Sequence, residues 1–221
     1  MTTVLECKEL HKSYGTERVL RGVNLTLKAG TISVIKGYSG CGKTTLLRCL
    51  AGLSSFDDGE IVYSFNGSII KNGGSLHQNR YTLFPSLSIV FQQLYLWPHM
   101  TARQNIDSVW RKARDGYSKG EMEALSDKLG IIELLDKYPS QLSLGQNQRV
   151  ALLRAISFKP KLLLLDEVTS ALDAKNIEIV VNILRELKRI NCSVLAITHS
   201  SEFSEQLKAE AYIMDGGKLT S

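Results

Sequence analysis

The segment TISVIKGYSGCGKTTLLRCLAGL at residues 31–53 is the part of the sequence that most clearly indicates the fold class. It opens with a short β-branched run, Thr31 to Ile35, which is typical of a buried strand. A glycine-rich loop follows, and then Lys43 to Leu53 has helical character and meets Gly52. A strand, a glycine loop and a helix in this order predict the first half of a βαβ unit, and therefore a parallel sheet.

The loop inside this stretch, GYSGCGKT at residues 37–44, matches the phosphate-binding pattern GxxxxGK[ST]. Its glycines let backbone N–H groups converge on phosphate oxygens, and the N-terminus of the following helix adds positive potential. We expect Lys43 to reach the β- and γ-phosphates and Thr44 to bind Mg²⁺. The nucleotide-binding residues predicted here are Gly37, Ser39, Gly40, Cys41, Gly42, Lys43, Thr44 and Thr45.

A second strand carries two carboxylates. Leu162 to Leu165 is an apolar run that ends in Asp166 and Glu167, at the strand end where open α/β sheets place their ligands. An acidic pair after a strand is, by itself, also consistent with a solvated turn. Beside a phosphate loop, Asp166 is expected to complete the magnesium shell and Glu167 to orient or deprotonate an attacking water.

The rest of the chain supplies elements around this core. The pattern predicts an alternating strand at 19–27, a polar loop with hairpin pieces at 64–86, several short helices at 101–137, a helix at 177–187, a buried strand at 193–198 and a hairpin turn at 215–217.

The composition is that of a globular protein. Apolar residues make up 43% and charged residues 22% of the 221 residues, which excludes collagen-like and wholly disordered chains. No apolar run approaches the ~18 residues typical of a membrane span, and residues 1–10 lack the pattern of a secretory signal. We therefore expect a cytosolic protein.

The charge balance is mildly basic. The 27 Lys and Arg residues against 22 Asp and Glu residues give a net charge of +5, which suits anionic partners without choosing among them. The densest basic cluster, Arg111 to Arg114, is interpreted as a solvated helix face and not as a nucleic-acid patch. No CxxC pair or nearby His accompanies the cysteines, so we expect reduced thiols at Cys7, Cys41, Cys49 and Cys192.

Five further motifs carry a resemblance to a family. Leu142-Ser143-Leu144-Gly145-Gln146, followed by Gln148-Arg149, is similar to the LSGGQ signature of the ATP-binding cassette ATPases. In the family's order, the chain also has Tyr14 in the place of the adenine-stacking aromatic, Gln92 as the Q-loop glutamine, Ser170 to Asp173 as the D-loop and His199 as the switch histidine. The resemblance covers essentially the whole chain.

The resemblance implies a fold. We expect one α/β domain over residues 1–221, with a RecA-like P-loop NTPase core sheet and an N-terminal antiparallel β-subdomain. A helical subdomain at roughly 93–140 is expected between core segments at 1–92 and 141–221.

The resemblance also implies a mechanism in which two copies bind ATP head to tail. Ser143 and the backbone N–H of Gly145 would meet the γ-phosphate held by the partner copy, at a helix beginning near Gln146. Hydrolysis would then loosen the dimer. The implied catalytic residues are Glu167, His199 and Gln92; the implied metal ligands are Thr44, Gln92 and Asp166; and the further nucleotide contacts are Tyr14, Ser143, Gly145 and Asp173.

Within the family, residues 90–106 and 138–155 look most like ATPase subunits of bacterial importers for polar amino acids. The implied partners are permease subunits that dock at Gln92 and the helical subdomain, a second ATPase subunit in a homodimer or pseudo-dimer, and, for an importer, a separate substrate-binding protein. The implied location is the cytoplasmic face of the inner membrane, and no nucleic acid is implied. Trp97 and Met100 either line this docking groove or belong to the subdomain core. Lipoprotein-release and cell-division ATPases share the same compact length and stay as alternatives.

Three residues depart from the family pattern. Leu144 stands where the first signature glycine is usual, and Val168 and Tyr38 stand where prolines are usual. A Cβ at Leu144 would exclude positive φ and close approach to a nucleotide, which leaves open a regulatory cassette that binds ATP without hydrolysing it. Cys41 is either an oxidation-sensitive thiol or a small buried residue of the loop.

Overall fold

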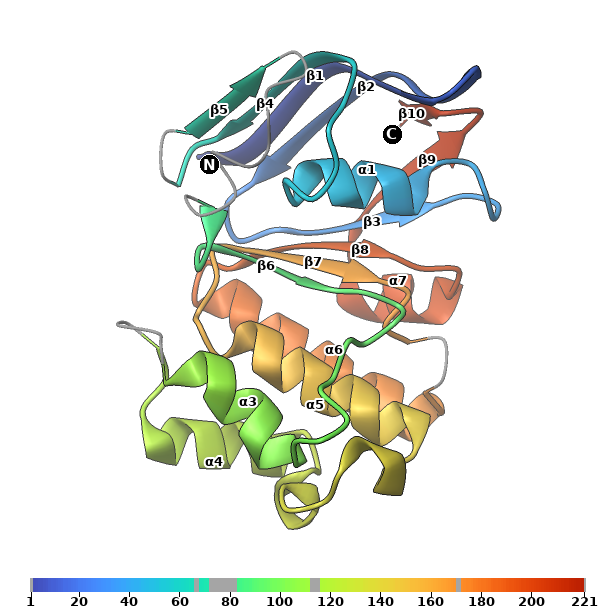
Figure 1. Ribbon diagram of the computed structural model, residues 1–221. Helices are drawn as coiled ribbons and strands as arrows, with labels where there is room; N and C mark the ends of the chain where they lie inside the picture. The colour runs from blue at the N-terminus through green and yellow to red at the C-terminus, as the bar shows by residue number, and fades with distance from the viewer. Residues whose placement is uncertain (1, 66–67, 72–82, 112–115, 170–171, 221) are drawn as a thin grey trace.

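Two sheets organise the molecule in the computed structural model, which describes residues 2–65, 68–71, 83–111, 116–169 and 172–220 (Figure 1). The antiparallel sheet runs in the order β2-β1-β4-β5. Its strands are β1 (Thr3–Tyr14), β2 (Glu17–Lys28), β4 (Asp58–Tyr63) and β5 (Ser68–Lys71). The alternating strand expected at 19–27 is therefore confirmed as part of β2.

The core sheet runs in the order β10-β9-β3-β8-β7-β6, and its neighbours pair in parallel except for the antiparallel pair β9–β10. Its strands are β3 (Ile32–Lys36), β6 (Leu87–Val90), β7 (Leu162–Asp166), β8 (Ser193–Ile197), β9 (Glu210–Asp215) and β10 (Lys218–Thr220). The fold class expected from the sequence, a parallel core sheet with an N-terminal antiparallel sheet, is confirmed.

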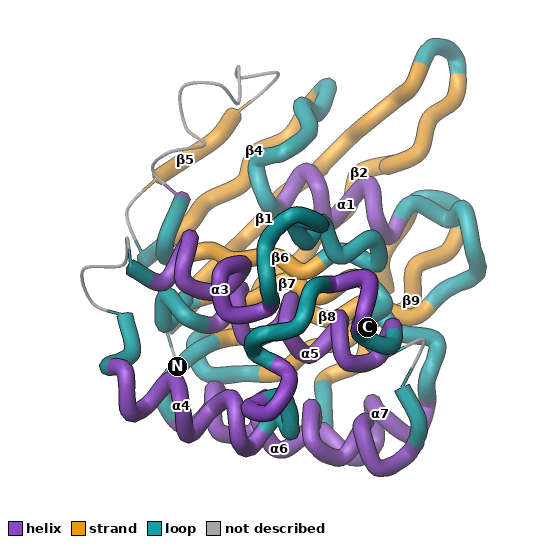
Figure 2. The backbone as a smooth tube through the Cα atoms, turned by 60° about the horizontal axis from the view of Figure 1, so that its bottom comes forward, coloured by secondary structure: helices purple, strands orange, loops and turns teal. Residues whose placement is uncertain are grey.

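The helices lie on both faces of the core sheet. Helix α1 lies between the two sheets, while α5 and α6 cover the opposite face of the core sheet and α3 and α4 lie beyond them (Figure 1). Seen from that side, the helices stand in front of the strands (Figure 2). Their bounds are α1 (Lys43–Leu50), α3 (Ala102–Trp110), α4 (Lys119–Lys128), η1 (Ile132–Leu134), η2 (Pro139–Gln141), α5 (Leu144–Ile156), α6 (Ala174–Arg189) and α7 (Ser201–Leu207).

The leucine run of β7 shows how one strand serves two cores. Successive side chains of a strand point to opposite faces. Leu162 and Leu164 belong to the core shared with α1 and the antiparallel sheet, whereas Leu163 and Leu165 belong to the core shared with α5 and α6. All five residues of β7 are buried. Burial on both faces explains the continuous apolar run and holds the carboxyl end of the strand firmly.

The first helix ends earlier than the sequence pattern predicts. α1 stops at Leu50, because the N–H groups of Gly52 and Leu53 turn back to the carbonyls of Cys49 and Arg48. The expected extension to Leu53 is therefore wrong. The end of α1 is also tied to the antiparallel sheet, because the buried hydroxyl of Tyr63 donates to Leu50 O at 2.8 Å.

Short helices fill the stretch where the sequence predicts them. Helix α3 starts with a capping box made by Thr101 and Gln104, and α4 starts with one made by Ser118 and Glu121. The hydrogen bonds from Ser118 also hold the pKa of the Glu121 carboxyl below its usual range. Caps of this kind stabilise helices too short to persist alone.

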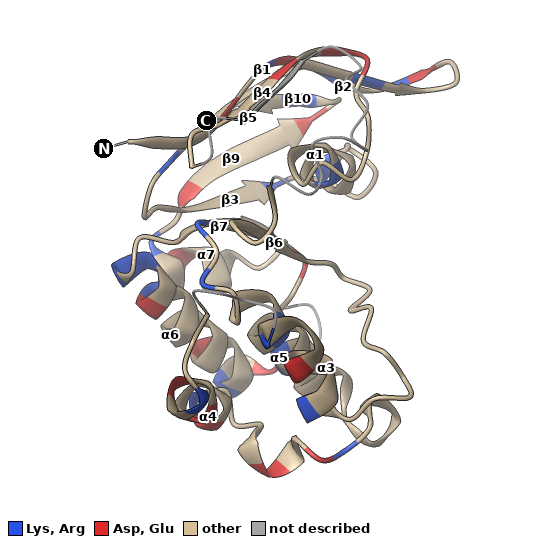
Figure 3. Cartoon of the chain, turned by 60° about the vertical axis from the view of Figure 1, so that its left-hand side comes forward, with Lys and Arg blue, Asp and Glu red and all other residues tan. Residues whose placement is uncertain are grey.

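Charged residues of both signs are interspersed along α4 and α6 (Figure 3). Of the basic cluster at 111–114, the structure describes Arg111, which pairs with Asp107 at 2.9 Å; residues 112–115 lie outside the described ranges. Parts of the expected loop at 64–86 lie outside them too, at 66–67 and 72–82.

All four cysteines are free and buried. Over the described ranges, we find no helix with the length and apolar character that crossing a membrane requires.

Candidate active site

A cavity of about 430 Å³ lies at the carboxyl ends of the core strands, beside the loop that joins β3 to α1. Apart from Val19, every residue lining it is one that the sequence analysis singled out. The lining consists of Tyr14, Val19, Ser39, Gly40, Gly42, Lys43, Thr44, Thr45, Gln92 and Glu167. The sequence analysis did not identify Val19 as a cavity residue, because an apolar residue in an alternating strand is also the pattern of an ordinary core residue.

The loop is packed tightly against two other segments. Gly37 has φ +155° and Gly42 has φ +108°, values that side chains rarely tolerate. A Cβ at Gly37 would overlap Met214 O of β9, and a Cβ at Gly42 would lie 2.9 Å from Val19 O of β2. Glycine is therefore required at both positions by space as well as by conformation.

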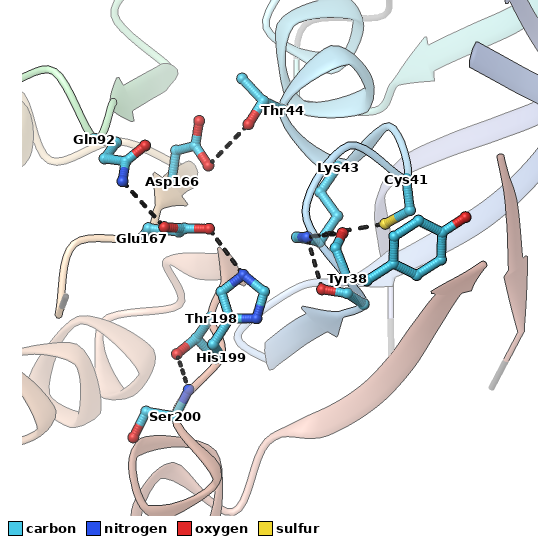
Figure 4. A network of polar contacts seen from close by, with 11 residues as sticks. Tyr38, Cys41, Lys43, Thr44, Gln92, Asp166, Glu167, Thr198, His199 and Ser200 are labelled. Carbon is cyan, nitrogen blue, oxygen red and sulfur yellow. Dashed lines mark hydrogen bonds and ion pairs between the residues drawn. The ribbon is translucent and has the colours of Figure 1, made fainter. Parts of the chain in front are cut away.

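Lys43 places its charge inside this loop. Its side chain is buried, and Nζ donates to Gly37 O and Tyr38 O, both at 2.8 Å (Figure 4). Nζ also lies 3.8 Å from the Sγ of Cys41. Because Cys41 is 4% exposed and packs inside the loop, the structure favours the interpretation of Cys41 as a small buried residue.

A hydroxyl and a carboxylate meet at the start of α1. Thr44 Oγ1 donates to Asp166 Oδ1 at 3.3 Å. Burial raises the pKa of the Asp166 carboxyl, and the Thr44 hydrogen bond opposes that rise. Both groups are hard oxygen donors of the kind that Mg²⁺ prefers. Among the described residues, no group of three or more His, Cys, Asp or Glu is arranged to hold a metal ion.

Glu167 is the centre of a second contact network (Figure 4). Its Oε2 accepts from Gln92 Nε2 at 3.2 Å, and its Oε1 lies 3.0 Å from His199 Nε2. The three residues follow β6, β7 and β8, which are neighbours in the sheet, so their carboxyl ends meet. Glu167 has φ +52°, a strained value of the kind that clusters at functional sites.

Comparisons with known proteins identify the family of this chain. The sequence profile of the family described as "ABC transporter" matches residues 20–170. This chain belongs to the ABC transporter family. It is an ATP-binding cassette ATPase. A profile described as "AAA domain, putative AbiEii toxin, Type IV TA system" also matches residues 138–205.

Individual relatives resemble this cassette over nearly its whole length. The L-cystine import ATP-binding protein TcyN of Bacillus subtilis is 36% identical, over 98% of this chain and 84% of that protein. The arginine transport ATP-binding protein ArtP of Haemophilus influenzae is 34% identical, over 97% of this chain and 90% of that protein. Among solved structures, the dimeric ATP-binding cassette MJ0796, in a post-hydrolysis state bound to ADP and Pi, is 30% identical with a TM-score of 0.81, covering 98% of this chain and 97% of that one.

Other predicted residues of the cassette lie away from the cavity. Ser143 is the N-cap of α5, where its Oγ accepts from Gln146 N at 3.2 Å and its N–H donates to Gln146 Oε1 at 2.8 Å. Gly145 is buried in the first turn of that helix. Asp173 is the N-cap of α6, and Ser170 and Ala171 lie outside the described ranges. A single chain therefore does not bring these residues to its own nucleotide cavity.

The signature helix begins earlier than expected, at Leu144 instead of near Gln146. Leu144 is the first residue of α5 and is 58% exposed. Its backbone is right-handed helical, so the position does not require the positive φ that would favour glycine. The backbone conformation at position 144 is therefore compatible with leucine.

This geometry predicts that Leu144→Gly lowers stability without raising activity. Glycine in a helix adds freedom to the unfolded chain, so the free energy of unfolding should fall by about 0.5–1 kcal/mol. Thermal unfolding and steady-state ATPase rates measure the two effects. Leu144→Ala is the matched control, because it removes the same side chain and keeps helix propensity. A several-fold rate gain in the glycine variant alone would contradict this interpretation.

Proposed function

We propose that this chain is the ATP-hydrolysing subunit of a membrane importer for a polar amino acid. The assignment of ATP hydrolysis is supported by the network of Gln92, Glu167 and His199 beside the phosphate loop. The substrate class rests on the relatives, which are named as import or transport proteins for cystine, glutamine and arginine.

We assign the nucleotide contacts as follows. Tyr14, 51% exposed at the cavity wall, stacks on the adenine, and the loop around Lys43 holds the phosphates. Thr44, Asp166 and Gln92 would hold Mg²⁺, which would neutralise charge on the phosphate oxygens. The direct contact between Thr44 and Asp166 supports this, because it brings two of these three groups together.

Glu167 orients the attacking water and accepts its proton. Two partners from two other strands hold its carboxylate, so its position is fixed before a substrate arrives. His199, 3.0 Å from Glu167, is placed to contact the γ-phosphate. Such preorganised groups lower the barrier without reorganising at the moment of reaction.

Two copies close around the nucleotide. Ser143 and the N–H of Gly145 begin a helix, and a helix N-terminus attracts phosphate. Because these groups lie away from the cavity of their own chain, we assign them to the γ-phosphate bound by the second copy, with Asp173 near the same interface. The dimeric form of the solved cassette MJ0796 supports this arrangement.

The membrane permease docks on the side of Gln92 and the helical subdomain, roughly residues 93–140. An open cavity of about 500 Å³ lies there, lined by His99, Met100, Gln104, Asp107, Ser108 and Arg111. Trp97, 40% exposed, lies in the same loop. We place the cassette peripherally on the cytoplasmic face of the membrane, with a separate substrate-binding protein delivering the amino acid. An export or cell-division role is the alternative for the same chemistry.

The assignment of roles predicts two different defects. Lys43→Ala should abolish nucleotide binding, because it removes the charge inside the loop. Glu167→Gln should bind MgATP normally and hydrolyse it at least ~100-fold more slowly, since a lost base typically costs 10²- to 10⁴-fold. Equilibrium binding and steady-state turnover separate them. Near-normal turnover by the glutamine variant would assign proton transfer to another group.

The head-to-tail arrangement predicts ATP-dependent dimerisation. The wild-type chain should be mostly monomeric without nucleotide, and Glu167→Gln should dimerise when ATP is added, because the γ-phosphate that joins the copies is not removed. Size-exclusion chromatography at micromolar concentration measures this, with ADP as the matched control. A variant that saturates with ATP and still elutes as a monomer would argue against the roles of Ser143 and Gly145.

The importer assignment predicts the partner. A tagged chain should co-purify with a permease. Vesicles containing both, with the substrate-binding protein added on the side opposite the cassette, should take up a labelled polar amino acid, such as cystine, glutamine or arginine, when ATP is supplied on the cassette side. Vesicles with Glu167→Gln are the control and should not accumulate it. Co-purification with a lipoprotein-release or cell-division complex would replace the importer assignment and leave ATP hydrolysis intact.

A further inference from the structure

The loop between β6 and α3 carries Gln92 and is held by a half-buried guanidinium from another helix. Arg154, in the last turn of α5, donates from Nη2 to Leu94 O and from Nη1 to Tyr95 O, both at 2.8 Å. Its guanidinium carbon also lies 5.6 Å from the centre of the Trp97 ring. One side chain therefore contacts three of the four residues 94–97.

Arginine is specific to this arrangement. Its planar fork can donate to two carbonyls while it lies over an aromatic face, whereas a lysine ammonium cannot hold the same three contacts at once. Burial lowers the pKa of Arg154, and among the described residues no carboxylate forms an ion pair with it. Its charge is instead met by two neutral carbonyls and an aromatic face, and all three of these contacts lie on the same loop.

The same loop has a second anchor on α3. Asn105 is fully buried; its Oδ1 accepts from Trp97 N at 2.8 Å, and its Nδ2 donates to the carbonyls of Trp97, Met100 and Thr101, each at 3.1 Å. Trp97 is the point that both anchors share. The loop is thus fixed to α5 from Leu94, two residues beyond Gln92, and to α3 from Trp97, five residues beyond Gln92.

We propose that Arg154 is a positioning residue for ATP hydrolysis, which sets the place of Gln92 relative to Glu167 by fixing the loop to α5. The proposal rests on the proposed function, because Gln92 and Glu167 have a catalytic role only there. Arg154 lies in the last turn of α5, whose N-cap is the signature residue Ser143.

The experiment compares kinetic constants of the full chain for MgATP. Arg154→Lys should lower kcat about tenfold, since small misplacements of catalytic groups cost one to two orders of magnitude, and it should leave KM and the Kd for ATP within twofold. Arg185→Lys is the matched control. Arg185 also joins two elements by donating to a backbone carbonyl, Gln206 O at 2.6 Å, and it lies on α6 away from the cavity. Its kcat should equal that of the wild type.

A double variant tests whether Arg154 acts through Gln92. If it does, Arg154→Lys combined with Gln92→Ala should have the kcat of Gln92→Ala alone. If the two substitutions lower kcat independently, so that their fold-reductions multiply in the double variant, the proposal is overturned. A wild-type kcat in Arg154→Lys would overturn it too. Both results would leave the proposed function standing. A wild-type kcat in Gln92→Ala, or a chain without ATPase activity, would overturn the catalytic assignment and this proposal together.

Trp97→Leu is a second test, in case Arg154→Lys lowers kcat only because the variant folds poorly. It removes the contact between the ring and Arg154 without changing α5. It should reproduce the fall in kcat at unchanged KM. If Trp97→Leu folds with a melting temperature like that of Arg185→Lys and keeps a wild-type kcat, the ring contact does not position the loop and the proposal fails.

Discussion

At Gly37 and Gly42 the phosphate loop approaches β9 and β2 so closely that neither position admits a Cβ. This close approach joins three segments that are far apart in the chain. β2 belongs to the antiparallel sheet and β9 to the core sheet, and α1 lies between the two sheets with its buried side in the core that they share. The loop is therefore packed between the two sheets. This packing fixes the carbonyls of Gly37 and Tyr38, which accept hydrogen bonds from Lys43 Nζ and keep its charge inside the loop.

The order of the core strands brings the remaining polar groups to that loop. Gln92 and Glu167 are 75 residues apart in the chain, yet they make contact because β6 and β7 are hydrogen-bonded neighbours. β8 lies on the other side of β7 and delivers His199 to the same carboxylate. The leucine run of β7, buried on both faces, keeps the central strand of these three in place. The strained backbone of Glu167 is supported by its N–H bond to Ile197 O at 3.0 Å.

Local patterns predicted the elements of this site better than their boundaries and contacts. The phosphate loop and the acids after β7 could be read from the sequence, because each depends on a few consecutive residues. The end of α1 and the start of α5 were predicted wrongly although each also has a local signal. Gly52 and Leu53 donate back to the last turn of α1, and Ser143 and Gln146 form the capping box that starts α5 at Leu144. The convergence of residues after β6, β7 and β8 follows from strand order, which no local pattern contains. The contact of Arg154 with the Gln92 loop is likewise a product of tertiary packing.

The three departures from the family pattern can now be judged by their surroundings. Val168 is 5% exposed and belongs to the core on the α5 and α6 side, so it fills space there. Tyr38 is 57% exposed, and its Oη accepts from Gly216 N at 3.3 Å, which ties the loop to the turn between β9 and β10. Leu144 extends from the first turn of α5 and is exposed. The backbone of this chain does not require glycine at Leu144, because the residue is right-handed helical. Any requirement for a small residue there must therefore come from the surface that Leu144 meets, which in the dimer proposed above is the nucleotide site of the second copy.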